Sequence, residues 1–475
     1  MSQPSELPPL KAIPGSYGHR FFGPYADRFD YFYRQGTEEF FRSRVNKYGS
    51  TVFRVNMPPG PFVSPDPKVV VVLDATSFPV LFDTSKVEKR NVLDGTFMPS
   101  TDYMGGTRVC AFLDPSEPSH TANKRFIFYL LHSWHDTLVP LFRNSMQDFF
   151  VRLDDAFSAK GEAYFNSFSD QMSFDFILRL FCRKDPSETS ISYKTFDKWL
   201  FLQLSPLITT KPLKILDVLE DLLLHTFPLP TFLVKSDYKK MYEVFYASNT
   251  EALGEAEKLG LGKKDACNNL VFLAGFSAYG GMKTTFPALI KWIGKAGEGL
   301  HRQLAEEIRT VVRSEGGVTL GALEKMPLTK SVVYEALRME PPVPFQYGKA
   351  KEDIIIHSSD GSAYEIKKGE MIFGYQPFAT RDPNVFKRAE EFVGDRFVGP
   401  EGEKMLRYVY WSNGRETENP TVENKQCPGK DMVVLLCRVM VVEFFLRYDT
   451  FMVESGTLAL GSTVTFKSLS KATSH

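Results

Sequence analysis

Apolar residues recur at helical spacing through much of the middle of the chain. In the segment 300–311, leucine, isoleucine and valine stand at steps of four, four and three residues, which places them along one stripe of a helix. The segment 328–337 repeats the pattern. Pro327 suits the first turn of that helix, and a following pair of prolines must end it. We therefore predict that residues from about 120 to about 345 are mostly helical.

Strands are predicted on either side of this helical region. Residues 51–56 and 68–73 are apolar and β-branched, and the breakers of Met57–Pro61 separate them. Residues 354–356 and 364–366 flank a Ser-Asp-Gly turn and are typical of a hairpin. These short runs predict only small β-sheets.

The last part of the chain predicts an irregular stretch to about residue 426 and then a helix from about 430 to about 447. No internal repeat, low-complexity segment or linker divides the sequence. We therefore predict one domain over residues 1–475, mostly α with small β-sheets.

Composition and charge exclude several classes of protein. Hydrophobic residues make up 43% and charged residues 24%, which is typical of a globular chain. Lys plus Arg number 57 and Asp plus Glu number 57, so the net charge of zero gives no sign of a nucleic-acid partner. Phe accounts for 41 of 475 residues, which suits a large apolar cavity, although a Phe-rich core would look the same.

Cysteine usage and the termini bear on location. Five scattered cysteines argue against a disulfide framework and for a reducing compartment. Residues 1–20 show no signal or transit peptide, and the apolar stretches 69–73 and 432–442 fall short of the roughly 20 residues of a spanning helix. We predict a cytoplasmic protein. The apolar segment 222–234 is a candidate for peripheral membrane or lipid contact, with buried loop packing as the alternative.

Cys427 carries the clearest chemical signal, because it lies in the Pro-Gly loop Asn424–Lys430 directly before the final helix. Exposed amides and the dipole at a helix N-terminus lower the pKa of a thiol there, which suits a metal ligand. A buried structural cysteine is the alternative. Upstream stand Glu335 and Arg338 at i, i+3 spacing, followed by Arg396. An isolated Glu/Arg pair is commonplace, but the ordered set is much rarer.

This order of motifs resembles the cytochrome P-450 superfamily over almost the whole chain. The resemblance implies the cytochrome P-450 fold and heme b as the cofactor, with Cys427 as the axial thiolate ligand of the iron. It also implies that Glu335, Arg338 and Arg396 form a buried network that supports the cysteine loop. Thiolate ligation pushes electron density onto iron and favours O–O cleavage.

Two features depart from members that activate dioxygen. Residues 272–281 of the predicted central helix contain no acid to form an acid–alcohol pair with Ser277. The heme loop is also long: Gly414 stands 13 residues before Cys427, and the inserted residues 415–423 change the face on which a reductase would dock. We therefore expect no reductase partner.

These departures resemble a plant-type branch that acts on fatty-acid hydroperoxides and comprises allene oxide synthases, hydroperoxide lyases and divinyl ether synthases. The resemblance implies a polyunsaturated fatty-acid hydroperoxide as substrate and homolytic O–O cleavage at a ferric heme, without dioxygen or NADPH. The similarity is carried by Ile13–Gly18, Asn56–Phe62, Ser331–Glu335, Gln346–Gly348, Tyr375–Pro377 and Asn424–Cys427.

Within this branch the chain most resembles the 9/13-hydroperoxide lyases. We expect a lyase acting on the 9- or 13-hydroperoxides of linoleic and linolenic acid, with C–C scission through a hemiacetal to an aldehyde and an oxoacid. An allene oxide synthase is the second reading. A reductase-dependent monooxygenase is disfavoured by the central helix, and a non-enzymatic heme or lipid-binding protein by the intact cysteine loop.

Three positions bear on the choice between lyase and synthase. Leu93 matches a position where synthases commonly carry Phe and lyases Leu, although an ordinary core leucine is as good an explanation. Gly275 stands in an Ala-Gly-Phe sequence similar to that of lyases, where it would make room for a ligand, and close helix packing is the alternative. Ser277 replaces the Asn that relatives use to hold the hydroperoxide, so that contact would be weakened or redirected.

The remaining candidates surround the cofactor and the substrate. His120 and Lys124 are at i, i+4 spacing and are expected to face the heme propionates, with Lys89 and Lys425 as further candidates. Solvated surface residues are the alternative. Residues expected to line the substrate pocket are Phe276, Pro344 and Phe345.

Overall fold

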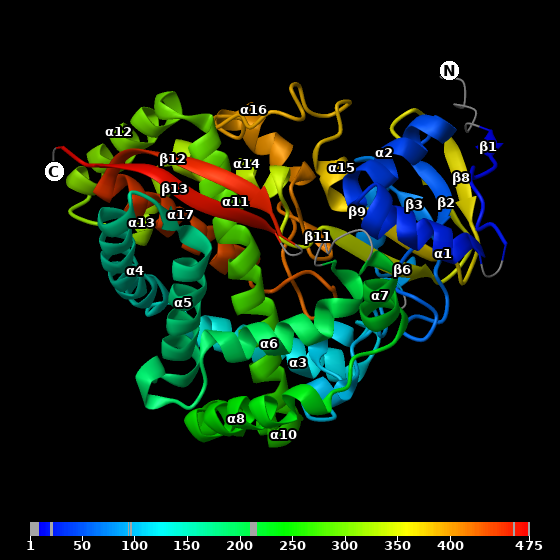
Figure 1. Cartoon of the computed structure of the whole chain (residues 1–475), viewed down its shortest axis with the longest axis horizontal. Helices are drawn as coiled ribbons and strands as arrows, with labels where there is room; N and C mark the ends of the chain where they lie inside the picture. Colours follow the sequence, from blue (N-terminus) through cyan, green and yellow to red (C-terminus); the bar gives the residue numbers. More distant parts are fainter. Residues whose placement is uncertain are drawn as a thin grey trace, which may run out of the picture.

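The central element is a long helix that runs through the middle of the molecule, with helices on one side and the largest sheet on the other (Figure 1). The computed structural model describes residues 9–473 except 20, 21, 94, 96, 210–215, 459 and 460. Much of the N-terminal segment on which the absence of a leader peptide was predicted lies outside the described residues.

The α-helices alternate with short connections through most of the described chain. Their bounds are α1 Phe22–Phe29, α2 Thr37–Tyr48, α3 Pro118–Trp134, α4 Leu138–Lys160, α5 Phe165–Ile177, α6 Tyr193–Leu204, α7 Asp217–Glu220, α8 Phe232–Ser248, α9 Thr250–Lys258, α10 Lys263–Phe272, α11 Gly280–Ala296, α12 Glu298–Ser314, α13 Leu320–Glu324, α14 Pro327–Met339, α15 Gln376–Thr380, α16 Gly399–Met405 and α17 Lys430–Arg447.

The strands are short except for two near the C-terminus. Their bounds are β1 Leu10–Lys11, β2 Val52–Asn56, β3 Lys68–Val72, β4 Val87–Glu88, β5 Ala163–Tyr164, β6 Phe345–Ala350, β7 Ile354–His357, β8 Ala363–Ile366, β9 Met371–Tyr375, β10 Tyr410–Trp411, β11 Gly414–Arg415, β12 Tyr448–Thr457 and β13 Ser462–Lys471.

The strongest periodic patterns predicted their elements correctly. α12 and α14 coincide with the two apolar stripes, α14 begins at Pro327, and α17 begins at Lys430. The predicted strands β2 and β3 pair antiparallel, and β7 and β8 form the predicted hairpin. The fold is mostly α with small β-sheets, as predicted.

Several β elements were missed, and two of them shape the sheets most. β9 lies in the stretch predicted to be irregular, yet it joins β3 in parallel and β6 antiparallel in the five-stranded order β2-β3-β9-β6-β4. A central strand covered on both faces lacks the alternation that marks a strand in sequence. The hairpin of β12 and β13 was also missed, and it pairs with β5 in a second sheet.

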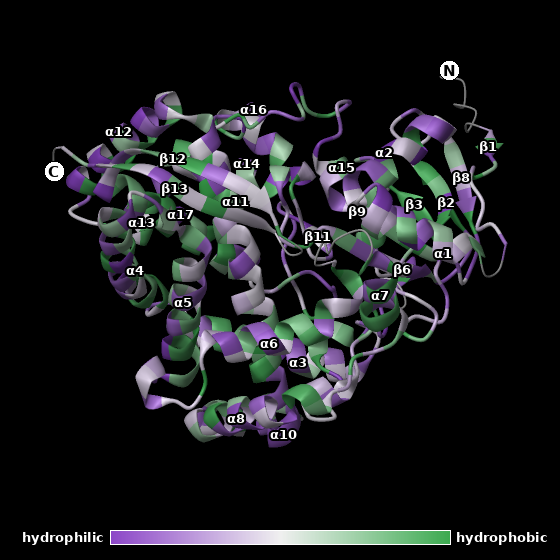
Figure 2. Ribbon diagram, viewed as in Figure 1, coloured by the Kyte–Doolittle hydropathy of each residue, from purple (hydrophilic) through white to green (hydrophobic). Residues whose placement is uncertain are grey.

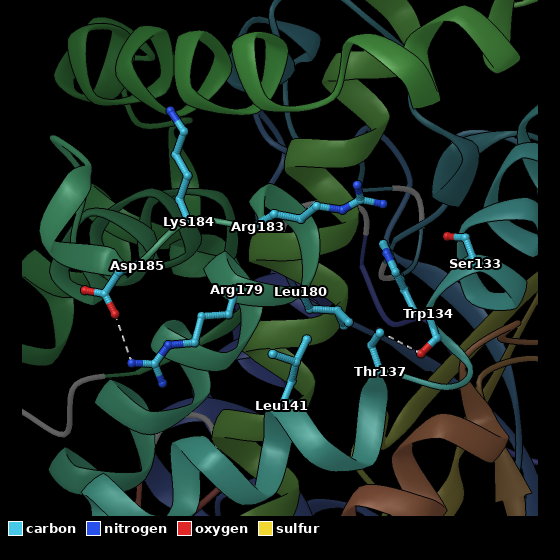
Figure 3. Close-up of a pocket in the computed structure, with 9 residues that line it drawn as sticks. All are labelled: Ser133, Trp134, Thr137, Leu141, Arg179, Leu180, Arg183, Lys184 and Asp185. Atoms are coloured by element: carbon cyan, nitrogen blue, oxygen red, sulfur yellow. Dashed lines mark hydrogen bonds and ion pairs between the residues drawn. The ribbon is translucent and has the colours of Figure 1, made fainter.

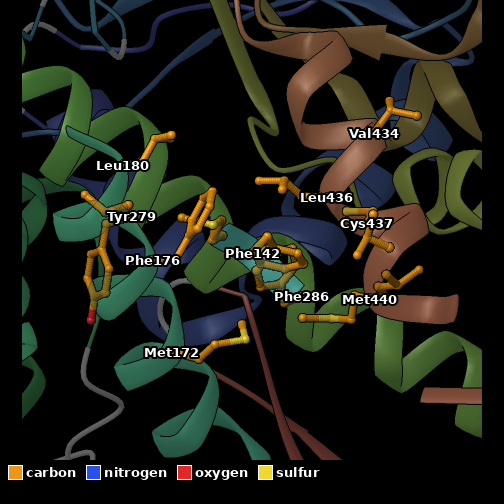
Figure 4. Close-up of a cluster of buried hydrophobic side chains, with 14 of the residues drawn as sticks. Phe142, Met172, Phe176, Leu180, Tyr279, Phe286, Val434, Leu436, Cys437 and Met440 are labelled. Carbon is orange, nitrogen blue, oxygen red and sulfur yellow. The ribbon is translucent and has the colours of Figure 1, made fainter. Parts of the chain in front are cut away.

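The main core lies where α4, α5, α11 and α17 meet. Figure 4 shows its buried side chains, among them the rings of Phe142, Phe176 and Phe286. The Phe142 ring centroid lies 5.1 Å from that of Phe176 and 5.7 Å from that of Phe286. These rings hold α11 against α4 and α5, and the same cluster includes Leu436, Cys437 and Met440 of α17, which carries the cysteine loop at its start.

Candidate active site

The loop before α17 holds Cys427 by its backbone. The amide of Cys427 donates to the Ser412 carbonyl at 3.0 Å, and the amide of Gly429 donates to the Cys427 sulfur. Cys427 is partly exposed, whereas the other four cysteines are buried. Burial raises the pKa of the Cys427 thiol, and the Gly429 amide and the Lys124 ammonium only offset this in part. The prediction of a lowered pKa is therefore wrong for the free thiol, and a bound metal ion would supply the deprotonation.

Lys124 and Lys425 were predicted to face the heme propionates, but both ammonium groups donate hydrogen bonds to backbone carbonyls instead. The buried Lys124 Nζ donates to the carbonyls of Thr421 (3.1 Å), Asn424 (3.1 Å) and Gln426 (2.8 Å). It therefore ties α3 to the cysteine loop.

Lys425 ties the same loop to a second segment. Its Nζ donates to the carbonyls of Cys110 (3.0 Å), Ala111 (2.8 Å) and Leu113. Burial lowers the pKa of both Lys124 and Lys425 to about 8. Their sequence positions indicated proximity to the site correctly, but the direction of each side chain depends on the fold.

Lys89 and His120 differ from those two lysines. Among the described residues, Lys89 Nζ and His120 Nδ1 are buried polar atoms without a hydrogen-bond partner. Burial, together with the charge of Lys425, lowers the pKa of Lys89 to about 7 and that of His120 to about 4. A buried amine and a buried imidazole beside the cysteine loop fit a ligand that carries carboxylates, as heme b does, because a carboxylate raises both pKa values and so lets Lys89 Nζ and His120 Nδ1 donate to it.

The inserted residues 415–423 are organised around a carboxylate that sequence reasoning missed. Glu416 accepts from Tyr334 Oη at 2.7 Å and from Trp411 Nε1 at 2.5 Å, and Lys430 Nζ lies 3.6 Å from its Oε1. The insertion is therefore bonded to α14 and to the start of α17. A buried aromatic donor paired with an acid leaves no signal in a single sequence.

Gln426, also missed, lies against Gly414. Its Nε2 donates to the carbonyls of Arg415 at 2.7 Å and Glu418 at 3.2 Å. A Cβ at Gly414 would stand 2.5 Å from the Gln426 side chain, so this loop requires a glycine there.

The Glu335 network is buried beneath this loop region. Arg338 donates from Nε to Glu335 Oε2 at 2.7 Å and from Nη2 to Oε1 at 2.9 Å. Arg396 Nε and the Val393 amide each reach Glu335 Oε1 at 2.9 Å. Arg338 also donates to the carbonyls of Thr380 (3.1 Å) and Ala389 (2.8 Å). The network joins α14 to the segment that leads to the heme loop.

The central helix passes through a π-helical turn, Leu273–Tyr279, between α10 and α11. Ser277 in this turn is exposed, and Phe276 is partly exposed and stacks on Phe272 at 4.6 Å between ring centroids. Gly275 and Tyr279 are buried on the other side of the turn. Ser277 therefore stands on an open face of an otherwise internal helix, where a ligand can reach it.

Gly275 does not open space for a ligand, contrary to the prediction. A Cβ at this position would stand 2.9 Å from the Trp199 ring and 3.7 Å from the Phe196 ring, both on α6. Close packing of α6 against the π turn, the alternative from the sequence, explains this glycine.

Leu93 is partly exposed and packs against the main core. Two residues before it, the Asn91 amide donates to the Phe112 carbonyl at 2.9 Å, and the Phe112 ring lies 5.5 Å from that of Phe272 on α10. The segment that carries Leu93 therefore lies beside the start of the central helix.

The β6 strand contributes a different residue from those predicted. Phe345 stacks on Tyr375 at 5.4 Å within an aromatic cluster of the sheet, and the Pro344 carbonyl accepts the Gln376 amide at 2.7 Å. Gln346, on the opposite face of the strand, accepts the amide of Asn413 at 3.2 Å and so faces the cysteine loop. The period of two in a strand could have indicated Gln346.

A surface pocket of about 400 Å³ lies apart from these residues (Figure 3). Arg179, Arg183 and Lys184 line it beside Trp134, and Arg179 pairs with Asp185 at 3.0 Å. No predicted site residue is among its lining residues.

Comparison with known proteins gives consistent matches. Residues 298–452 match the family described as cytochrome P-450. Allene oxide synthase 3 of Solanum lycopersicum is 57% identical, over 98% of this chain and 95% of its own length. The chloroplastic allene oxide synthase of Arabidopsis thaliana is 53% identical over 98% and 90%, and allene oxide synthase 2 of Oryza sativa subsp. japonica is 53% identical over 97% and 97%.

These relatives overturn the prediction of a hydroperoxide lyase. Synthases match at 53–57% identity over nearly the whole chain although Leu93 and Gly275 favoured a lyase. Gly275 is explained by its packing against Trp199, and Leu93, which is partly exposed and packs against the core, does not by its residue type distinguish a lyase from a synthase.

The predicted cytoplasmic location finds no support in the comparisons, since the Arabidopsis thaliana relative is named chloroplastic. Across the part of the chain that the structure describes, no helix combines the length and apolar character needed to cross a membrane.

The buried Glu335–Arg338–Arg396 network, the cysteine loop, and Lys89 Nζ and His120 Nδ1, which have no hydrogen-bond partner among the described residues, fit a heme site. The cofactor is a heme whose iron takes a thiolate ligand, and the substrates of the branch are hydroperoxides. The chain belongs to the cytochrome P-450 family, in the branch of enzymes that metabolise fatty-acid hydroperoxides.

Proposed function

We propose that the protein is an allene oxide synthase, a dehydratase that converts a polyunsaturated fatty-acid hydroperoxide into an allene oxide and water. The observation that carries this proposal is the match to allene oxide synthases at 53–57% identity over at least 97% of the chain. The 9- and 13-hydroperoxides of linoleic and linolenic acid are the expected substrates.

The reaction balances without an outside oxidant or reductant. The O–O bond of the substrate breaks, one oxygen remains as the epoxide, and the other leaves as water with the hydroxyl hydrogen and a proton from carbon. The heme, when bound, supplies the one-electron chemistry that breaks the O–O bond. Residues 272–281 contain no acid to protonate dioxygen, which supports turnover without NADPH or a reductase.

On the proximal side we assign Cys427 as the thiolate ligand. Lys89 and His120 would hold the propionates, because Lys89 Nζ and His120 Nδ1 are buried and have no hydrogen-bond partner in the described part of the chain. Lys124 and Lys425 keep the loop in place through backbone carbonyls.

On the distal side Ser277 would orient the hydroperoxide, because its hydroxyl stands on the open face of the central helix. Phe276, Leu93 and Pro344 are partly exposed and would contact the acyl chain. Phe345 and Gly275 are assigned to packing.

We also propose that the segment from residue 216 to 233 contacts a lipid surface. This segment buries Asp221 and His225, while its apolar side chains face outward. Asp221 pairs with Arg28 of α1 at 2.7 and 2.8 Å, which fixes the segment in this inverted orientation. Figure 2 shows the hydrophobic ribbon at α7 beside α1. The exposed residues are Leu216, Val218, Leu219, Leu222, Leu223, Phe227, Phe232 and Leu233.

A segment that exposes its apolar side chains and buries its charged ones favours contact with an apolar surface. A lipid surface fits, because the proposed substrate is itself a lipid. Replacing Leu222→Gln and Leu223→Gln together should reduce flotation with phospholipid vesicles. Leu320→Gln, at an exposed leucine on α13, is the control and should leave flotation unchanged. Equal flotation of all forms would contradict the lipid contact.

Product analysis tests the proposed activity. Purified protein incubated with each hydroperoxide, without NADPH and without dioxygen, should yield ketols, the hydrolysis products of an allene oxide. Cys427→Ser should lose both this activity and the thiolate-type heme spectrum. Strict dependence on NADPH and a reductase would contradict the proposal.

A further inference from the structure

The π turn Leu273–Tyr279 in the central helix is packed against helix α6 on its buried side. π-Helical turns inside α-helices are rare and are frequent at functional sites. This one carries Ser277 on its open face and Tyr279 on its buried face. Two residues apart on a helix point in roughly opposite directions, by about 160–200°. A rotation of the turn that moves the Tyr279 hydroxyl therefore also moves the Ser277 hydroxyl.

α6 covers the buried side of the turn at closely spaced points. The absent Cβ of Gly275 leaves room for Trp199, and that of Gly280 would stand 3.4 Å from Leu200. The ring of Tyr279 lies 5.5 Å from that of Phe196 in an edge-on arrangement. These apolar contacts hold the two helices together, but they are not directional.

One hydrogen bond between the π turn and α6 is directional and can fix how the two elements are oriented. The Tyr279 hydroxyl donates to Asp197 Oδ1 on α6 at 2.8 Å, and the tyrosine side chain is fully buried. Burial raises the pKa of Tyr279, and the nearby carboxylates of Asp170 and Asp197 raise it further, so the hydroxyl stays protonated. Lys283 Nζ lies 3.0 Å from the same Asp197 oxygen and also pairs with Asp170 on α5. Figure 4 shows Tyr279 at the edge of the core cluster with its hydroxyl directed away from it.

We propose that the Tyr279–Asp197 hydrogen bond is a positioning device that fixes the rotation of the π turn and so sets where Ser277 stands over the bound substrate. Tyr279 is fully buried and Asp197 lies on α6 behind the turn, so both would act on the substrate through the turn and not by contact. The inference rests on the proposed function, because Ser277 matters only if a hydroperoxide binds on that face.

Four variants separate the hydrogen bond from the charge. Tyr279→Phe removes the donor, and Asp197→Leu removes the acceptor. Asp197→Asn keeps an acceptor oxygen but loses the charge that faces Lys283. Tyr238→Phe is the matched control, because its buried hydroxyl donates to Asn268 of α10 at 2.7 Å, ahead of the π turn.

The rate of hydroperoxide disappearance is measured for each variant, together with the heme Soret band during titration with an unreactive hydroxy fatty acid. Tyr279→Phe and Asp197→Leu should lower kcat about tenfold with KM changed by less than about twofold, because misplacement of a contact group acts mainly on the reacting geometry. Both should alter the ligand-induced Soret shift. Asp197→Asn should retain kcat within about threefold of the unmodified protein, and Tyr238→Phe should behave like it.

Two results would overturn the inference. Tyr279→Phe could match Tyr238→Phe in both kcat and Soret shift, which would make the hydroxyl irrelevant to the site. Alternatively, Asp197→Asn could be as impaired as Asp197→Leu, which would transfer the role to the charge pair with Lys283. The rate of hydroperoxide disappearance and the Soret shift do not depend on which product forms. A protein that produced aldehydes would therefore contradict the proposed function without affecting this test.

Discussion

The two sides of the heme site are built in opposite ways. Around Cys427 two lysines hold the loop in place, since Lys124 and Lys425 each donate to three backbone carbonyls. Around Ser277 the turn is π-helical and open, and it is held from behind by α6. The comparison teaches that the contacts around Cys427 fix the geometry of the loop, whereas the position of Ser277, on the proposed substrate side, depends on how α6 packs against the turn.

The largest effect is expected from breaking the proximal network. Glu335→Gln leaves Arg338 and Arg396 without a carboxylate in a fully buried position, which should lower the free energy of unfolding by about 3–5 kcal/mol. Thermal unfolding and the heme-to-protein ratio measure this effect. Glu390→Gln is the control, because Glu390 pairs with Arg381 with 60% of its side chain exposed and should change stability by about 0.5 kcal/mol or less. Equal stability of the two variants would contradict a rigid proximal side.

A smaller effect is expected at Lys124. Lys124→Met leaves three loop carbonyls without their buried donor, and we expect a loss of about 2–3 kcal/mol with a weakened thiolate-type spectrum. The reduced carbon monoxide spectrum measures the fraction of thiolate-bound heme. Lys198→Met removes an exposed pair with Asp237 and should leave that fraction unchanged. If Lys124→Met kept both the spectrum and stability, the loop would be held by other contacts.

Gly275→Ala tests the distal side. The new methyl group would stand 2.9 Å from Trp199, so α6 must shift, and we expect a cost of about 1–3 kcal/mol. Unfolding temperature should fall while the product remains a ketol. If Gly275→Ala instead changed the products from ketols to aldehydes without changing stability, Gly275 would line the substrate pocket after all.

The smallest effect concerns pH. The pKa of Lys89, lowered by burial to about 7, should rise when a heme carboxylate lies beside it. Below that pKa Lys89 is already protonated, and above it heme binding must take up a proton. Lys89 should therefore lower the affinity of the apoprotein for heme as pH rises from about 7 to about 9. Loss of the Cys427 proton on metal binding acts in the opposite direction, so the contribution of Lys89 is read as the difference in slope between the unmodified protein and Lys89→Met.

Titration of the apoprotein with heme at several pH values measures this slope. Lys89→Met should make affinity rise more, or fall less, with pH, whereas Lys86→Met, at an exposed lysine three residues away, should leave the slope unchanged. An identical slope in all three forms would remove Lys89 from the propionate site.

The sequence predicted the helices whose apolar residues or terminal signals are clear in the sequence, such as α12, α14 and α17. It did not predict β9, because a central strand shows no alternation. The cysteine loop was recognisable from its own residues. The directions of the Lys124 and Lys425 side chains could not be recognised, because their acceptors are backbone carbonyls that only the folded chain brings near.

The reading of Gly275 and Leu93 failed for a related reason. A glycine in a helix indicates close approach, but sequence alone does not say whether a ligand or Trp199 is the group that approaches. Leu93 is partly exposed and packs on the core, so its residue type alone does not identify the product.

The fate of the two peroxide oxygens tests the proposed dehydratase most directly. The substrate is a fatty-acid hydroperoxide with both peroxide oxygens isotopically labelled, converted without dioxygen or NADPH and trapped at once for mass spectrometry. The account predicts that the organic product keeps one labelled oxygen and that the other appears in water. Retention of both labelled oxygens in the organic products, one in an aldehyde and one in an oxoacid, would contradict it.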